Sequence, residues 1–188
     1  KILDWGCGSG RLTRSIAELG FEIDAYDPII EYKKKVTANP NINWVDGPKD
    51  IESNRYSVVI SNLVLCEIES DDESKEVLNI ISKSLESNGK ALVTVCHPDS
   101  VNVRCSSTIE RPLISLNQGK VTYTKIVRST GRERLEHTRT LEKIREMANS
   151  VGLKINQTFN SPGMNIDDCT HTSEYLCIEF IKVENKKD

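Results

Sequence analysis

Residues 1–10 read Lys-Ile-Leu-Asp-Trp-Gly-Cys-Gly-Ser-Gly, and this stretch decides the fold. Ile2 and Leu3 are typical of the end of a buried strand, and Asp4 follows at the carboxyl edge of that strand. Three glycines then recur at every second position, and residues 11–19 carry apolar side chains at helical spacing. A strand, a tight glycine turn and a helix together predict a nucleotide-type ligand at the helix N-terminus. The expected apolar stripe of that helix is Leu12, Ile16 and Leu19.

The spacing of the glycines distinguishes between nucleotides. The dinucleotide fingerprint G-x-G-x-x-G requires its third glycine at position 11, where this chain has Arg11. Asp4 adds a carboxylate that suits a ligand with ammonium and sulfonium groups better than a pyrophosphate. The pattern D-x-G-x-G-x-G after a strand resembles the first motif of the class I S-adenosylmethionine-dependent methyltransferases. This resemblance implies S-adenosylmethionine as cofactor and S-adenosylhomocysteine as product.

The order of expected elements predicts the fold class. Strands and helices alternate along the chain, which indicates an α/β, doubly wound sheet within one domain, residues 1–183. The methyltransferase resemblance implies a Rossmann-like sheet of seven strands, mostly parallel, with an antiparallel last strand. After the first strand, further strands are expected at residues 21–27, 41–45, 56–65, 90–96, within 151–158, and at 174–183. Helices are expected at residues 11–19, 29–36, 70–85 and 140–150, and residues 184–188 are expected to form a frayed, charged tail.

Polar residues at the ends of these strands are the candidate cofactor ligands. Asp27 is placed where a carboxylate can accept the ribose hydroxyls, although it could also cap a helix that starts at Pro28. Asp46 matches the family position beside adenine, but Asp46-Gly47 is also an ordinary turn signal. Asn62 and Leu63 resemble the family's fourth motif, beside the methionine part of the cofactor, and differ from the Asn-Pro-Pro-Tyr form of DNA adenine or glutamine methyltransferases. The predicted cofactor-binding residues are Asp4, Gly6, Cys7, Gly8, Gly10, Asp27, Pro28, Asp46, Gly47, Asn62 and Leu63.

Residues 99–136 depart from a minimal α/β domain, in which a short loop would join the fifth strand to the next helix. Residues 120–128 and 133–138 are expected to form a hairpin around a turn at residues 129–132. Ligands bind at the carboxyl edge of such sheets, so we interpret the insertion as a lid over the substrate; a surface loop or dimer contact is the alternative. Basic residues in and after it could receive an anionic substrate or an RNA backbone, or form a solvated face. They are Lys120, Lys125, Arg128, Arg132, Arg134, Arg139, Lys143 and Arg145.

Three residues are candidates for acid–base chemistry on the methyl acceptor. His97 directly follows the fifth strand, in Cys-His-Pro-Asp, and His137 enters the next helix from the insertion. Histidine titrates near neutral pH, which suits a general base. The run His-Thr-Arg-Thr-Leu at 137–141 also resembles a junction in the small-molecule "type 11" group of methyltransferases. Glu67, just past the fourth strand, is the third candidate. Each of the three could instead have a structural role, as a partner of buried backbone groups or as a helix cap.

Composition limits the remaining choices. The six cysteines lack C-x-x-C spacing and fit reduced thiols in a cytoplasmic protein. Cys66, Cys96 and His97 could gather at one sheet edge, but their spacing matches no familiar zinc site, so no metal is expected. No apolar run could cross a membrane, and no signal-like start is present. The net charge of −3 argues against extended nucleic-acid binding.

The sequence therefore predicts a cytoplasmic S-adenosylmethionine-dependent methyltransferase. It is expected to transfer a methyl group by in-line displacement to an oxygen or nitrogen of a small, possibly anionic molecule. Two alternatives remain: an RNA or protein methyltransferase that docks through the basic insertion, and a non-catalytic cofactor-binding protein. We expect a monomer or a homodimer. The resemblance also implies a helical segment before the first strand, and the given sequence begins inside that strand.

Overall fold

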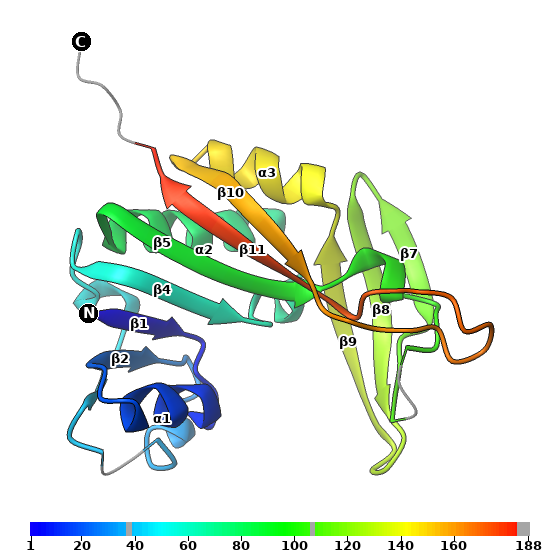
Figure 1. Cartoon of the computed structure of the whole chain (residues 1–188), viewed down its shortest axis with the longest axis horizontal. Coiled ribbons are helices and arrows are strands. Elements are labelled where there is room, and N and C mark those ends of the chain that lie inside the picture. Colours follow the sequence, from blue (N-terminus) through cyan, green and yellow to red (C-terminus); the bar gives the residue numbers. More distant parts are fainter. Residues whose placement is uncertain (37–38, 106–107, 184–188) are drawn as a thin grey trace.

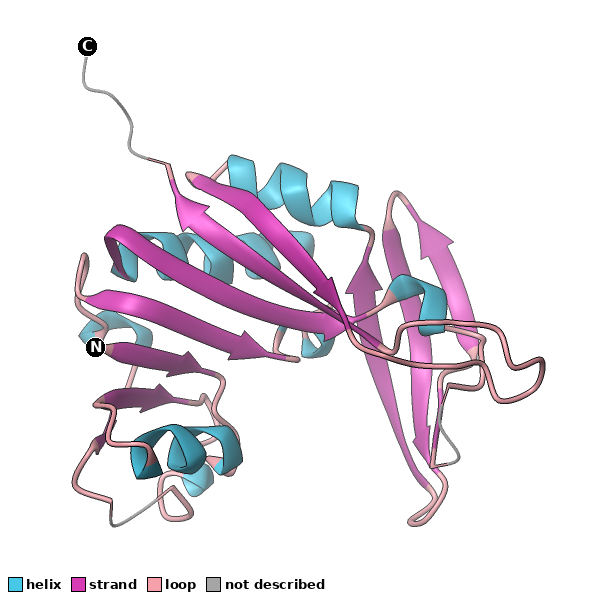
Figure 2. Ribbon diagram, viewed as in Figure 1, coloured by secondary structure: helices cyan, strands magenta, loops and turns pink. Residues whose placement is uncertain are grey.

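The structure is a computed structural model that describes residues 1–36, 39–105 and 108–183. Its main sheet has seven strands in the order β10-β11-β5-β4-β1-β2-β3 (Figures 1 and 2). β11 runs antiparallel to both of its neighbours, whereas β1 to β5 are parallel. The strands are β1 (Ile2–Trp5), β2 (Ile23–Tyr26), β3 (Ile42–Trp44), β4 (Tyr56–Asn62), β5 (Leu85–Cys96), β10 (Leu153–Asn160) and β11 (Tyr175–Lys182). The predicted doubly wound sheet with an antiparallel last strand is confirmed.

Three α-helices accompany this sheet in the described part of the chain: α1 (Arg11–Glu18), α2 (Asp71–Ser84) and α3 (Leu141–Asn149). Figure 1 shows α1 in front of the sheet and α2 behind it. The second and third helices start at side-chain caps, because the hydroxyls of Ser70 and Thr140 accept from the backbone N–H three residues later. The core between the helices and the sheet includes Leu3, Val59 and Ile178, all with no exposed surface. None of the described helices is long and apolar enough to span a bilayer.

Several expected boundaries were wrong. The predicted helix at residues 29–36 is only a short 3-10 turn, Ile30–Tyr32. β5 begins at Leu85 directly after α2, not at Lys90. The expected apolar stripe of α1 was also wrong, because this helix buries Thr13 and Ala17 while Leu12 and Leu19 are exposed. A polar residue lies on the buried side of α1 because its hydroxyl bonds to a buried carboxylate in β1.

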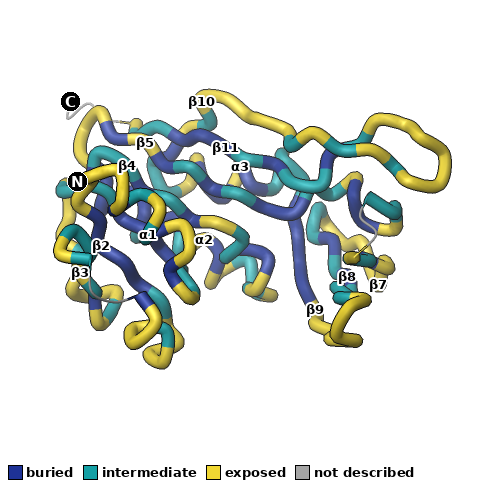
Figure 3. The backbone as a smooth tube through the Cα atoms, turned by 60° about the horizontal axis from the view of Figure 1, so that its bottom comes forward, coloured by how far each residue is buried: buried dark blue, intermediate teal, exposed yellow. Residues whose placement is uncertain are grey.

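The insertion forms a second sheet, which confirms the expected hairpin. β8 (Lys120–Val127) and β9 (Arg132–Arg139) pair along their whole lengths. Two strands that were not predicted, β6 (Ile109–Glu110) and β7 (Leu113–Asn117), pair with opposite ends of β8. This second sheet stands across the carboxyl ends of the main strands (Figure 1). Figure 3 shows β9 exposed near the hairpin turn and buried where it meets the main sheet. The predicted tail, 184–188, lies outside the described residues.

Arg139, at the end of β9, joins the two sheets. Its guanidinium is 2% exposed and donates from Nε to the Asp71 carboxylate at 2.8 Å. The two Nη atoms donate to four backbone carbonyls of the segment after β4, at 3.1–3.2 Å: Leu65, Ile68, Glu69 and Ser70. Thr138 adds a hydrogen bond from its hydroxyl to the Cys96 carbonyl at 2.6 Å. The insertion is therefore anchored to the main sheet at the carboxyl ends of β4 and β5.

Candidate functional site

Backbone hydrogen bonds hold the glycine turn after β1 against the end of β2. The Gly6 and Cys7 N–H groups both donate to the Tyr26 carbonyl at the end of β2. Gly6 has φ +78°, and a Cβ atom there would lie 2.2 Å from the Val64 side chain, so only glycine fits this close approach. Gly10 has φ +73° and would contact Val36 in the same way. Gly8 differs, because a Cβ at this position would meet no protein atom within 4 Å.

Asp4 is the buried carboxylate of this turn. It is 2% exposed, and its Oδ2 accepts a hydrogen bond from the Thr13 hydroxyl of α1 at 2.6 Å. Burial raises the pKa of the Asp4 carboxyl to about 6; the Thr13 bond offsets part of this rise, and the nearby charge of Asp27 adds to it. Burial likewise raises the pKa of the Cys7 thiol to about 12, so this cysteine is a neutral wall residue. The site thus holds a carboxylate that a ligand cation would stabilise.

A cavity of about 470 Å³ opens beside this turn. Its volume lies in the range of roughly 300–1,000 Å³ that is usual for small-molecule sites. Its lining joins the ends of β1 and β4 to the first turns of α1: Asp4, Gly6, Cys7, Gly8, Ser9, Arg11, Leu12, Ser15 and Asn62. Four of these lining residues were not predicted: Ser9, Arg11, Leu12 and Ser15. The helical pattern had placed Leu12 in the core.

The Asp27 carboxylate accepts hydrogen bonds from two backbone N–H groups. Its Oδ2 accepts from the Gly8 N–H at 2.8 Å, and its Oδ1 accepts from the Ile29 N–H at 2.9 Å. It therefore braces the glycine turn and caps the short turn that follows β2, in which Pro28 is exposed. A carboxylate has lone pairs for more than two donors. The predicted ribose contact is compatible with these bonds and stays a prediction.

The other predicted cofactor residues lie at the same sheet edge. Leu63 has φ +62°, and its N–H donates to the Thr94 carbonyl of β5 at 2.9 Å, which turns the chain just after Asn62. Asp46 is exposed and pairs with Lys33 at 2.6 Å, next to Gly47. Neither Asp46 nor Gly47 lines the cavity, so their adenine contact stays a prediction.

A second cavity, of about 500 Å³, lies between the turn after β2 and the insertion. One wall is Tyr32, from the turn after β2, and the other wall comes from β8, β9 and their hairpin: Lys125, Val127, Arg132, Glu133, Arg134 and Glu136. Glu136 is 3% exposed, and its two oxygens accept from the Tyr123 hydroxyl and the Lys125 ammonium, both at 2.9 Å. The sequence singled out none of Tyr32, Tyr123 and Glu136, because strand pairing joins only the last two and Tyr32 meets Glu136 only across the cavity.

The structure separates the three acid–base candidates. Glu67 forms an ion pair with Arg134 of β9, one of the residues that line the second cavity, and burial raises the pKa of the Glu67 carboxyl. His97 instead lines a different cavity, with Thr140 and Thr158, and its Nδ1 accepts from the Asp99 N–H at 3.2 Å. His137 lies within β9, not at the helix start; it is 4% exposed and bonds to the Thr122 hydroxyl at 3.1 Å. Burial lowers the pKa of this imidazole.

Cys66 and Cys96, considered above as possible metal ligands, contact each other. The Cys96 N–H donates to the Cys66 sulfur at 3.2 Å, and both side chains are buried. The ring of His97 faces Asp99 instead. Across residues 1–36, 39–105 and 108–183, no group of three His, Cys, Asp or Glu side chains could hold a metal ion.

Comparisons with known proteins bear on what this arrangement does. The sequence pattern of a family described as a methyltransferase domain matches residues 1–158. The chain belongs to this methyltransferase family. The chain is thus an enzyme of the class I type that its first ten residues predicted, with S-adenosylmethionine as its methyl donor. A search of curated proteins found no match.

Solved structures share the fold of this methyltransferase. A Listeria monocytogenes protein assigned as an S-adenosylmethionine-dependent methyltransferase is 22% identical with a TM-score of 0.70, covering 97% of this chain and 91% of that one. The glycopeptide N-methyltransferase MtfA, solved with S-adenosylmethionine, is 12% identical with a TM-score of 0.69, covering 96% and 86%. The 1,6-didemethyltoxoflavin-N1-methyltransferase of Burkholderia thailandensis is 16% identical with a TM-score of 0.61, covering 97% and 71%.

We expect cofactor affinity to depend on pH through Asp4. In the unliganded fold, burial gives the Asp4 carboxyl a pKa of about 6, so the carboxyl is mostly protonated below that pH. A bound cationic amino group favours its ionised form. Binding below pH 6 must then release a proton, and affinity should fall about tenfold between pH 7 and pH 5. Calorimetry with S-adenosylmethionine at several pH values measures this slope.

Asp4→Asn is the matched control, because its amide oxygen can still accept from Thr13. This variant should bind weakly and with no pH dependence over the same range. A wild-type affinity that is flat from pH 7 to pH 5 would contradict the role given to Asp4.

Proposed function

We propose that the protein transfers a methyl group from S-adenosylmethionine to a nitrogen or oxygen of a small molecule held in the 500 Å³ cavity beneath the insertion. One observation carries the proposal: the insertion and the turn after β2 together line a cavity at the edge of the sheet that also carries the glycine turn. Nitrogen acceptors are favoured by analogy, since two proteins of the same fold are named as N-methyltransferases.

The residues present fit the cofactor. When bound, S-adenosylmethionine supplies a methyl group on a sulfonium, and the departing thioether needs no protonation. Gly8 leaves open space where the ligand would approach the backbone, and Asp4 offers its carboxylate to the amino group. Asp27, Asn62 and the backbone at Leu63 would hold the remaining parts. The chain's main task is therefore to align the acceptor with the methyl group.

Glu136 is the carboxylate that we propose for the acceptor side. A nitrogen or oxygen nucleophile must lose a proton at or after transfer, and a carboxylate in the cavity can accept it or orient the N–H. Tyr123 and Lys125 hold both Glu136 oxygens and keep the carboxylate in place. Glu67 is the second candidate, because it pairs with Arg134, which lines the same cavity. His97 and His137 line neither the acceptor cavity nor the cofactor cavity, which weakens their candidacy.

The pairing of the basic side chains in and after the insertion supports a small-molecule methyl acceptor rather than RNA. Many of the basic residues that suggested docking are paired within the protein: Arg139 and Lys143 with Asp71, Arg128 with Glu110, and Arg134 with Glu67. Of the three cationic side chains that line the acceptor cavity, Lys125 pairs with Glu136 and Arg134 pairs with Glu67. The third, Arg132, has no ion-pair partner among the described residues, so we propose that it would meet a negative group on the acceptor.

Calorimetric titration with S-adenosylmethionine, S-adenosylhomocysteine and NAD tests the proposal. We expect binding of the first two and none of NAD. Asp27→Ala should weaken S-adenosylmethionine binding by about 1–3 kcal/mol, because it removes charge-assisted hydrogen bonds. Unchanged affinity would leave Asp27 only its role toward the Gly8 and Ile29 backbone. Binding of NAD alone, or of none of the three ligands, would contradict the proposal.

A further inference from the structure

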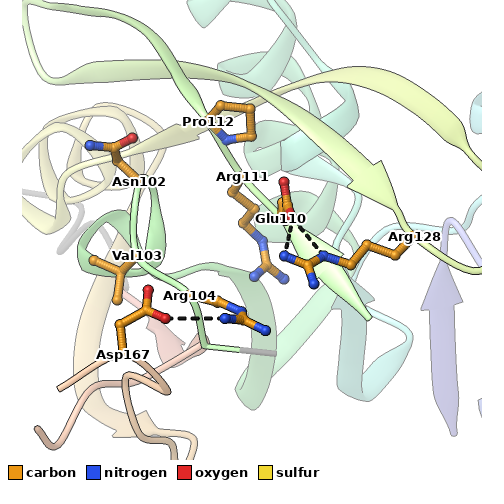
Figure 4. A pocket seen from close by; sticks show the side chains of 8 residues that line it. All are labelled: Asn102, Val103, Arg104, Glu110, Arg111, Pro112, Arg128 and Asp167. Carbon is orange, nitrogen blue, oxygen red and sulfur yellow. Dashed lines mark hydrogen bonds and ion pairs between the residues drawn. The ribbon is translucent and has the colours of Figure 1, made fainter. Parts of the chain in front are cut away.

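A fourth cavity, of about 190 Å³, lies at the base of the insertion and shares no lining residue with the three described above (Figure 4). Four segments that are distant in sequence meet there: the chain before β6, the β6–β7 junction, the end of β8, and the segment between β10 and β11. Its lining residues are Asn102, Val103, Arg104, Glu110, Arg111, Pro112, Arg128 and Asp167.

Three arginine side chains converge on this small space, with the Arg111 guanidinium between those of Arg104 and Arg128 (Figure 4). Each guanidinium has one carboxylate partner. Arg104 pairs with Asp167 at 3.2 Å, Arg111 pairs with Glu174 at 2.7 Å, and Arg128 pairs with Glu110. Three like charges side by side repel one another, and one carboxylate apiece balances this charge without filling the space between the guanidinium groups.

Two of the N–H donors of these arginines are buried and have no hydrogen-bond partner in the part of the chain that the structure describes. Arg111 is 3% exposed, and its Nη2 donates to Glu174 and to the Tyr175 hydroxyl. Its Nε is buried without a hydrogen-bond partner among the described residues, and so is the Nε of Arg104. Buried donors without partners are uncommon in folded proteins and often indicate a missing ligand or ion. Both of these arginines line the same 190 Å³ cavity.

We propose that this cavity binds a phosphate group, held by Arg104, Arg111 and Arg128. Guanidinium groups present paired N–H donors that match the oxygens of phosphate, and a tetrahedral oxyanion can accept from three arginines at once. A phosphate there takes the unused Nε donors and reduces the repulsion between the three guanidinium groups. Because three carboxylates already balance the arginine charges, we expect weak binding, in the millimolar range.

Thermal unfolding with increasing phosphate tests the site. The intact chain is titrated with inorganic phosphate from 0 to about 20 mM, with sodium chloride added to keep the ionic strength constant. We expect Tm to rise with the logarithm of the phosphate concentration once this exceeds Kd, because a ligand that binds only the folded state stabilises it by RT ln(1 + [L]/Kd). Glycerol 3-phosphate is the second probe. A larger shift with the ester than with the free ion assigns the site to esterified phosphate, and the reverse assigns it to the free ion.

Two arginines on the cavity's open side make suitable variants, since the side chains of Arg104 and Arg128 are 39% and 41% exposed. Arg104→Gln and Arg128→Gln should each raise about tenfold the phosphate concentration that gives a stated rise in Tm, the effect of losing one charge-assisted hydrogen bond. Arg145→Gln, exposed on α3, is the control and should behave as wild type. No shift beyond that with chloride, or full shifts in both variants, would overturn the proposal.

Discussion

Replacing Gly8 with valine should abolish S-adenosylmethionine binding while the chain still folds. A Cβ at this position meets no protein atom within 4 Å, so the added side chain would occupy only the cavity beside the glycine turn. The φ of +53° adds strain of about 1–2 kcal/mol, which a stable domain tolerates. We expect affinity to fall at least about 100-fold in calorimetry, a loss of about 2.7 kcal/mol or more.

Two further glycine variants separate strain from blocked binding. Gly20→Val has the same kind of strain, with φ +90° and no atom near its Cβ, but lies at the end of α1 away from the cavity, so it should bind as wild type. Gly6→Ala should impair folding itself, because its Cβ would lie 2.2 Å from Val64. Tight binding by Gly8→Val would show that the cofactor does not lie along this turn.

Arg139→Met should destabilise the protein by about 2–5 kcal/mol, because each buried backbone carbonyl left without a donor costs about 1–3 kcal/mol. The Leu65 and Ile68 carbonyls lose their donor. The other acceptors keep a partner: Ser70 keeps the Ser74 N–H, Glu69 keeps Lys120 and the Asp71 carboxylate keeps Lys143. Urea unfolding followed by circular dichroism gives this free energy. Cofactor affinity should fall too, because the released segment begins just after Val64, which packs on Gly6.

Arg145→Met is the control for this prediction, since Arg145 is exposed on the same stretch of chain. It should change the free energy of unfolding by no more than about 0.5 kcal/mol. Arg139→Lys should be intermediate, because an ammonium group keeps the charge but cannot reach all five acceptors. A loss below about 1 kcal/mol in Arg139→Met would mean that the insertion is held mainly by other contacts.

Local patterns predicted the main sheet well. The first strand, the glycine turn and the start of α1 lie where residues 1–11 predicted them, because strand and turn preferences act over a few residues. Boundaries that depend on distant partners were less accurate. β5 extends back to Leu85 because Leu85 pairs with Tyr56 of β4, and no local signal reports this pairing. Leu12 was assigned to the core by its helical spacing, yet it lines the cofactor cavity.

The candidate site also has a part that local sequence patterns predicted and a part that they could not predict. Asp4 and the three glycines could be placed from sequence because they belong to one continuous turn, along which we propose that the cofactor lies. The acceptor cavity could not, because Tyr32 and Glu136 are far apart in sequence and meet only when the insertion folds across the sheet edge. The same holds for the three arginines of the smallest cavity, which come from three different segments.

The sequence by itself determined the α/β class, the methyltransferase family and the position of the glycine turn, since each depends on short-range spacing of glycine, carboxylate and apolar residues. Only the tertiary structure decided which charges are available. Arg139, one of eight basic residues read as a docking surface, is buried against Asp71 and the carbonyls after β4. A charge in a sequence has no partner until the chain folds, and the partner decides whether that charge anchors the fold or meets a ligand.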